Sequence, residues 1–176
     1  MSITELAPAK LNLTLDVGAR RPDGYHEITS VMQSAALYDV VTLKAVETDD
    51  IVVECPGTDL PTGPDNLAWK AADVFFQETN IPYTGIFIRL EKKIPSQAGL
   101  GGGSSDAASV LRGMRRLFSI NVSDEALETM AARVGSDVPY CVRGGTALAR
   151  GRGERLTALS PLPMCWFVIV KPPVAH

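Results

Sequence analysis

The fold is decided by the stretch Pro95-Ser96-Gln97-Ala98-Gly99-Leu100-Gly101-Gly102-Gly103-Ser104-Ser105-Asp106, in which four of twelve residues are glycine. It follows an apolar alternating stretch and precedes a stretch with helical periodicity, which predicts a strand, a loop and a helix. Glycine adopts positive φ without steric cost and has no Cβ, so backbone amides can approach a ligand closely. The unpaired amides and the partial positive charge at the helix start also favour a bound anion. The sequence therefore predicts a loop that binds phosphate.

This loop has alternative interpretations: a flexible linker, a helix cap, or one of two better-known phosphate loops. A linker or a cap does not require the hydroxyls of Ser104 and Ser105, nor a strong helix behind them. That helix is indicated by apolar residues at spacings of 4, 3 and 4, namely Ala107, Leu111, Met114 and Phe118. The segment lacks the Gly-Lys-Ser/Thr of a P-loop. Ser104 stands where a dinucleotide fingerprint needs its third glycine.

Residues 9–17 alternate between apolar and polar side chains, which predicts a strand with one buried face. The residues expected on the buried face are Leu11, Leu13, Leu15 and Val17. Lys10 and Asn12 would project side by side from the polar face. On periodicity alone, a solvated edge of the sheet is the favoured interpretation for this polar pair.

A turn is predicted at Pro22-Asp23-Gly24, because proline sets φ, aspartate caps the local backbone and glycine accepts positive φ. Tyr25 and His26 follow directly. An aromatic residue beside a histidine after a turn is usually involved in packing. Together with a phosphate loop, the pair suits a nucleobase, because the ring can stack on the base and the histidine can hydrogen-bond its edge.

The other expected elements complete an α+β fold, with a mixed β-sheet and helices on one face. They are strands at 28–46, 51–55 and 86–90, a Pro- and Gly-rich loop at 56–64, and helices after the N-caps Asn66 and Ser123. Cys165–Val170 is an unbroken apolar run and predicts a further buried strand. Asp137 lies between Gly135, where a helix ends, and Pro139, a position that by itself favours an N-cap for the next short helix.

The composition suits one domain of 176 residues with a formal net charge of −3. This charge gives no general attraction to nucleic acid or to an anionic membrane surface, and no apolar run reaches the length of a membrane span. Three cysteines (Cys55, Cys141 and Cys165) lie far apart without metal-ligand spacing, so neither a zinc site nor a disulfide framework is expected. A reducing, cytoplasmic setting fits this pattern.

Several strings resemble the GHMP small-molecule kinases. Pro95–Ala108, with its triple glycine, is similar to the second motif of that family, and Ala7–Leu13 is similar to its N-terminal signature. Arg21–His26 and Gly135–Pro139 resemble the branch that acts on a cytidine diphosphate-linked methylerythritol. The resemblance extends over essentially the whole chain. It implies the α+β N-terminal domain of these kinases, which is related to a domain of ribosomal and translation proteins.

The resemblance also implies a reaction, the ATP-dependent phosphorylation of the 2-hydroxyl of that acceptor in the non-mevalonate isoprenoid route. Asp137 would be the catalytic base, and Lys10 would keep it ionised and favour the developing alkoxide. Asn12 would contact the acceptor, while Tyr25 would stack on the cytosine and His26 would hydrogen-bond its edge. Mg²⁺ would accompany the ATP phosphates, with protein ligands that the sequence does not identify. The residues expected to bind ATP are Pro95, Ser96, Gln97, Ala98, Gly99, Leu100, Gly101, Gly102, Gly103, Ser104, Ser105, Asn66 and Lys92.

The same resemblance implies a domain boundary. Residues 1–165 would form the ATP-binding and catalytic domain, and residues 166–176 would begin the connection to a C-terminal domain. One alternative is another GHMP kinase, of the mevalonate or homoserine type, against which the Gly24-Tyr25-His26 string argues. Another is an inactive fragment or module that binds only nucleotide or nucleic acid. The acidic balance argues against nucleic acid, so the expected partner is a small-molecule substrate.

Overall fold

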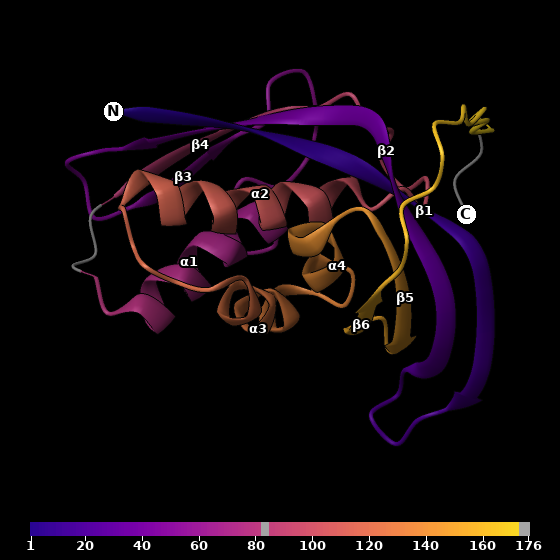
Figure 1. Cartoon of the computed structure of the whole chain (residues 1–176). Coiled ribbons are helices and arrows are strands. Elements are labelled where there is room, and N and C mark those ends of the chain that lie inside the picture. Colours follow the sequence, from indigo (N-terminus) through magenta and orange to yellow (C-terminus); the bar gives the residue numbers. More distant parts are fainter. Residues whose placement is uncertain (82–84, 173–176) are drawn as a thin grey trace.

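The computed structural model describes residues 1–81 and 85–172. One mixed sheet organises this part of the chain, with the order β3-β4-β2-β5-β6 and β1 paired along β2 (Figure 1). The strands are β1 (Ser2–Arg20), β2 (His26–Ala45), β3 (Ile51–Glu54), β4 (Ile86–Glu91), β5 (Thr146–Gly151) and β6 (Arg155–Ala158). The pair β3–β4 is parallel and the other pairs are antiparallel.

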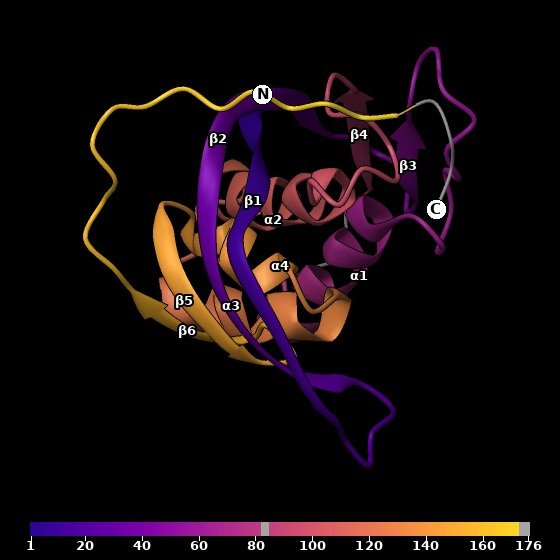
Figure 2. The same ribbon diagram turned by 90° about the vertical axis from the view of Figure 1, so that its right-hand side faces the viewer.

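The long hairpin of β1 and β2 connects two parts of this sheet. The last residues of β2 pair with β4, from Val40 to Ala45, and its first residues pair with β5, from Ile28 to Gln33. The register between β1 and β2 shifts near Pro8 and again near Asn12. Beyond the helices the hairpin projects as a free arm (Figure 2).

The helices lie on one face of the sheet (Figure 1), so the expected α+β fold with a mixed sheet is confirmed. They are α1 (Leu67–Thr79), α2 (Gly102–Leu117), α3 (Asp124–Val134) and α4 (Val138–Arg143). The central helix, α2, buries Leu111 and Met114 completely. A Cβ on its Gly113 would lie 2.2 Å from Leu43 Cδ1, so glycine allows α2 to lie close to β2.

The predicted N-caps Asn66 and Ser123 are confirmed. Asn66 Oδ1 accepts a hydrogen bond from the Ala68 amide at 2.9 Å, and Ser123 Oγ accepts one from Ala126 at 3.2 Å. Gly135 follows the end of α3, as predicted. Each of these interactions satisfies a backbone amide or marks a helix end within a few residues, so neighbouring sequence suffices to predict it.

Two burial predictions were wrong. In β1, Leu13, Leu15 and Val17 are 38%, 55% and 55% exposed, because they lie on the arm that no helix covers. Cys165–Val170 forms no strand and is exposed, since within the described residues no sheet edge pairs with it. An apolar run is buried only where another element covers it. Among the described residues, no helix is both long and apolar enough to cross a membrane.

Candidate active site

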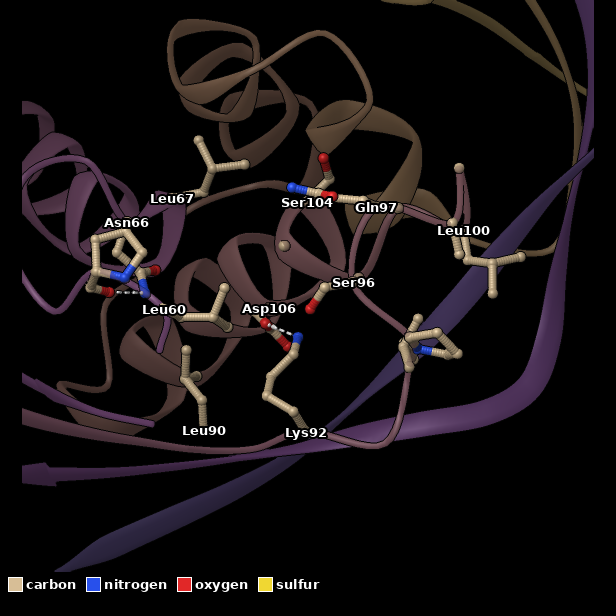
Figure 3. A pocket seen from close by; sticks show the side chains of 18 of the residues that line it. Leu60, Asn66, Leu67, Leu90, Lys92, Ser96, Gln97, Leu100, Ser104 and Asp106 are labelled. Carbon is tan, nitrogen blue, oxygen red and sulfur yellow. Dashed lines mark hydrogen bonds and ion pairs between the residues drawn. The ribbon is translucent and has the colours of Figure 1, made fainter. Parts of the chain in front are cut away.

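A pocket of about 450 Å³ lies against the glycine-rich loop (Figure 3). The loop between β4 and α2 forms much of its lining, and the start of α1 forms another part. The lining residues are Leu60, Pro61, Asp65, Asn66, Leu67, Leu90, Lys92, Ile94, residues 95–103, Ser104 and Asp106. The predicted order of strand, loop and helix is therefore the observed one, and the loop opens onto a cavity.

The loop exposes backbone amides because glycines turn the chain at its end. Gly99 and Gly101 have φ of +70° and +67°, and Gly101 is the N-cap of α2. Ser105 donates its amide hydrogen bond to the Gly101 carbonyl at 2.8 Å. Across residues 1–81 and 85–172, no acceptor takes a hydrogen bond from the amides of residues 102–104. Open amides at the start of a 16-residue helix suit an anion.

Asn66 lines the pocket, but its side chain is already engaged. Its Oδ1 caps α1, and its Nδ2 donates to the Pro61 carbonyl at 2.7 Å. The predicted contact of Asn66 with ATP stays a prediction, with this capping role beside it.

Lys92 also lines the pocket and lies in a buried cluster of charges. Its ammonium forms ion pairs with Asp39 of β2 and Asp106 of α2. Burial lowers the pKa of Lys92, but the two carboxylates outweigh it and raise the pKa overall. Burial raises the pKa of Asp106 to about 7, against the opposing effect of Lys92. The charge of Lys92 is thus balanced inside the protein before any ligand enters.

Sequence reasoning missed both carboxylates of this cluster. Asp39 is completely buried. The sequence pattern that could have indicated a buried carboxylate is a single aspartate among the apolar residues of Tyr38-Asp39-Val40-Val41. The sequence pattern assigned no role to Asp106 at the end of the loop. Within residues 1–81 and 85–172, its Oδ1 is buried without a hydrogen-bond partner, as is the Oγ of Ser105.

Lys10 and Asp137 form an ion pair beside the loop. Lys10 Nζ lies 3.0 Å from Asp137 Oδ2 and donates to Asn12 Oδ1 at 2.7 Å. Asn12 in turn donates to Ser30 Oγ at 2.7 Å. Asp137 occupies the N-cap position of α4, but its side chain makes no capping hydrogen bond. The carboxylate therefore faces Lys10 and leaves the helix start uncapped.

The backbone of Lys10 connects this ion pair to the loop. Its amide donates to the Leu100 carbonyl at 2.8 Å. A Cβ on Gly101 would lie 2.6 Å from Lys10 Cγ, so the lysine stem lies directly against the loop. The solvated sheet edge that periodicity favoured for Lys10 is wrong, because the loop covers this part of β1 and leaves Lys10 only 8% exposed.

Tyr25 and His26 lie on the projecting arm. The predicted turn is present, with Gly24 at φ +85° and the Asp23 carboxylate accepting from the Tyr25 amide at 3.2 Å. The Tyr25 ring is half exposed, and the Arg152 guanidinium lies 4.9 Å from its centroid. Sequence reasoning did not identify Arg152, which is in the turn between β5 and β6.

That turn joins the arm to the ion pair. A Cβ on Gly153 would lie 3.6 Å from Asp137 Oδ1. The neighbouring Arg152 contacts Tyr25. The β5–β6 turn therefore lies between Tyr25 on the arm and the pair Lys10 and Asp137 beside the loop. Among the described residues, no group of three or more His, Cys, Asp or Glu side chains is placed to hold a metal ion.

Comparison with known proteins identifies similar chains. Residues 66–145 match the family described as GHMP kinases N terminal domain. The chain is 46% identical over 99% of its length to the 4-diphosphocytidyl-2-C-methyl-D-erythritol kinase of Enterococcus faecalis, and covers 62% of that protein. It is 51% identical over 96% of its length to the kinase of the same name from Heliobacterium modesticaldum, and covers 53% of it.

A solved structure gives the same result. The crystal structure of a 4-(cytidine 5'-diphospho)-2C-methyl-D-erythritol kinase superposes with a TM-score of 0.76 at 42% identity. The match covers 92% of this chain and 56% of that protein. The chain thus spans little more than half the length of the proteins it matches.

Proposed function

We propose that the chain is the ATP-binding and catalytic part of a 4-diphosphocytidyl-2-C-methyl-D-erythritol kinase, because residues 66–145 match the GHMP kinases N terminal domain and the chain is 46% identical to such a kinase. Such an enzyme phosphorylates the 2-hydroxyl of its acceptor in the non-mevalonate isoprenoid route. The observation that carries this proposal is the ion pair of Lys10 with Asp137 against a loop of open amides. We further propose that residues 1–165 form this domain and that residues 166–176 lead toward a C-terminal one.

The loop would hold the phosphates of ATP. The free amides of residues 102–104 and the positive end of α2 can neutralise phosphate oxygens. Residues 95–101 complete the expected cradle, with Asn66 and Lys92 on the nucleoside side. The contact of Ser105 with ATP stays a prediction, since its side chain is buried and its amide is bonded to the Gly101 carbonyl. Mg²⁺ would arrive with the phosphates and needs few protein ligands. Asp106 lines the pocket, and its buried Oδ1, which has no partner among the described residues, has the chemistry of a Mg²⁺ ligand.

Asp137 would act as the general base. It would take the proton of the acceptor hydroxyl while the oxygen attacks the γ-phosphorus and ADP leaves. Lys10, whose Nζ lies 3.0 Å from Asp137 Oδ2, would stabilise the negative charge that develops on the attacking oxygen. Asn12, held by Ser30, would orient both Lys10 and the acceptor.

The arm would bind the cytidine end of the acceptor. Tyr25 offers an exposed ring for stacking, and His26 follows it at the start of β2. The short path from Tyr25 through Arg152 and Gly153 to Asp137 supports a single acceptor reaching from the arm to the base. The proposed partner is therefore a small molecule. The free cysteines Cys55, Cys141 and Cys165 support a reducing, cytoplasmic setting.

A second candidate is a chain that binds nucleotide without turnover. The chain spans 62% or less of the proteins described above, so an activity assay tests this candidate on the chain by itself. An enzyme-coupled assay of ADP release, run with a panel of acceptors, decides between the candidates. We expect turnover with the cytidine diphosphate-linked methylerythritol and none with mevalonate or homoserine. ADP binding without turnover on any acceptor supports the second candidate, and absence of ADP binding contradicts both.

A further inference from the structure

A single buried carboxylate, Asp39, contacts both ends of the phosphate loop. Backbone pairing between β2 and β4 ends at Val40 and Glu91. Asp39 is the next residue of β2, and its Oδ1 accepts hydrogen bonds from the amides of Lys93 and Ile94, the latter at 2.8 Å. Where the backbone hydrogen bonds between the strands end, the Asp39 side chain accepts the next two amide hydrogen bonds. It thereby fixes the point at which the chain leaves β4 and enters the loop.

The other oxygen of Asp39 acts on the far end of the loop. Its Oδ2 pairs with the ammonium of Lys92, which also pairs with Asp106 in the first turns of α2. A Cβ on Gly102, the first residue of α2, would lie 3.5 Å from Asp39 Oδ2. The residues at the entry to the loop and the first residue of α2 therefore both lie next to the Asp39 carboxylate. Asp39 itself does not line the pocket.

From this geometry we infer that Asp39 is a positioning residue for nucleotide binding. It sets the distance between the end of β4 and the start of α2, and so the direction in which the open amides of residues 102–104 point. The inference rests on the proposed nucleotide site. Asp39 would affect nucleotide binding only through Lys92 and the loop backbone, without contacting the nucleotide itself.

The variant Asp39→Asn distinguishes a role in positioning the loop for nucleotide binding from a role in fold stability alone. The variant keeps the volume and an oxygen for the amides of Lys93 and Ile94, but it turns an NH₂ toward Lys92. We expect the dissociation constant for ADP, measured by calorimetry, to rise roughly 10- to 100-fold, the equivalent of one hydrogen bond to a charged group. The dissociation constant for CDP, whose proposed site is on the arm, is expected to stay unchanged.

Glu5→Gln is the matched control. Glu5 also lies on a strand, is nearly as buried, and pairs with Arg112 and Arg116 of α2, away from the loop. It should lower the melting temperature and leave ADP binding unchanged. If Asp39→Asn lowers the melting temperature but binds ADP as the unchanged chain does, the inference is wrong while the proposed function stands. If the unchanged chain does not bind ADP, the proposed function is wrong, and the inference about Asp39, which rests on it, is wrong as well.

A measurement on the unchanged chain covers the case in which Asp39→Asn does not fold. The amides of Lys93 and Ile94 lie outside the strand ladder, so Asp39 alone accounts for their hydrogen bonds. We expect both to exchange with deuterium as slowly as the amides of β4, in the absence of nucleotide. Exchange at the rate of an open loop would show that Asp39 does not hold the loop entry.

Discussion

Lys10 is the residue at which the parts of the site meet. Its amide bonds to Leu100 in the loop, and its ammonium contacts both Asn12 and Asp137. Its side chain is largely buried, which strengthens its interaction with the carboxylate, since water screens the pair less. One residue can therefore couple the glycine-rich loop to the proposed base.

Asp137→Asn tests the proposed base. The variant keeps the size of the side chain but cannot accept a proton at neutral pH. We expect kcat in the ADP-release assay to fall roughly 10²- to 10⁴-fold, the usual contribution of a general base. The dissociation constant for ADP should not change. A loss of activity smaller than about threefold would mean that Asp137 has no role in proton transfer.

Asp106 predicts a pH dependence of stability. Its pKa is raised from 3.8 to about 7 in the folded chain, mainly by burial. Between these values the folded state holds a proton that the unfolded state has lost, so stability falls as the pH rises through this window, and the full penalty is present above it. The fall is at most about 1.4 kcal/mol per pH unit.

Asp106→Asn removes this titration. The free energy of unfolding of the variant and of the unchanged chain is measured in urea from pH 5 to pH 8. We expect the free energy of unfolding of the unchanged chain to fall relative to that of the variant as the pH rises. A constant difference over this range would show that Lys92 keeps Asp106 ionised throughout.

At the scale of elements, the loop depends on two glycines in the left-handed region with different surroundings. A Cβ at Gly99 would have nothing within 4 Å, whereas one at Gly101 would overlap the stem of Lys10. Backbone strain is therefore common to the two positions, and steric conflict is confined to one of them.

Gly101→Ala and Gly99→Ala form a matched pair. Both should lower stability by roughly 1 kcal/mol because alanine is strained at positive φ. Only Gly101→Ala should displace Lys10 and reduce kcat, by an expected tenfold or more for a misplaced catalytic group. Thermal unfolding and the ADP-release assay measure the two effects. Equal kcat in the two variants would contradict the contact between loop and lysine.

The projecting arm gives a second test at this scale. Tyr25→Ala removes the exposed ring proposed to stack on cytosine. We expect the dissociation constant for CDP to rise roughly 5- to 100-fold, the range of base–aromatic stacking. ADP binding should be unaffected. Tyr38→Ala, which changes a partly exposed tyrosine of β2, is the control. Unchanged CDP binding in Tyr25→Ala would remove the stacking role.

At the scale of the whole molecule, the described tail beyond Ser160 is coil (Figure 2). Its residues are exposed throughout, with Trp166 at 94% exposure. Ending the chain at Ser160 should therefore leave the melting temperature within about 2 °C, as for changes confined to the surface. Binding of an apolar fluorescent dye should decrease, because the exposed apolar run is gone. A large drop in melting temperature would show that the tail stabilises the domain.

Much of the site could be predicted because its signals are local. The loop after β4, the caps at Asn66 and Ser123, and the turn before Tyr25 each depend on φ or on backbone hydrogen bonds within a few residues. Asp39 was missed because its partners lie more than fifty residues away. No local pattern records a contact of that separation.

By itself, the sequence determined where the chain turns, where helices begin and where a phosphate could meet bare amides, since glycine and capping chemistry act over short distances. Only the tertiary structure decided burial. It covered Lys10, left Leu15 on an open arm and left Cys165–Val170 in solvent. Burial depends on which distant element lies over a residue, and the alternation of side chains along one strand does not contain that information.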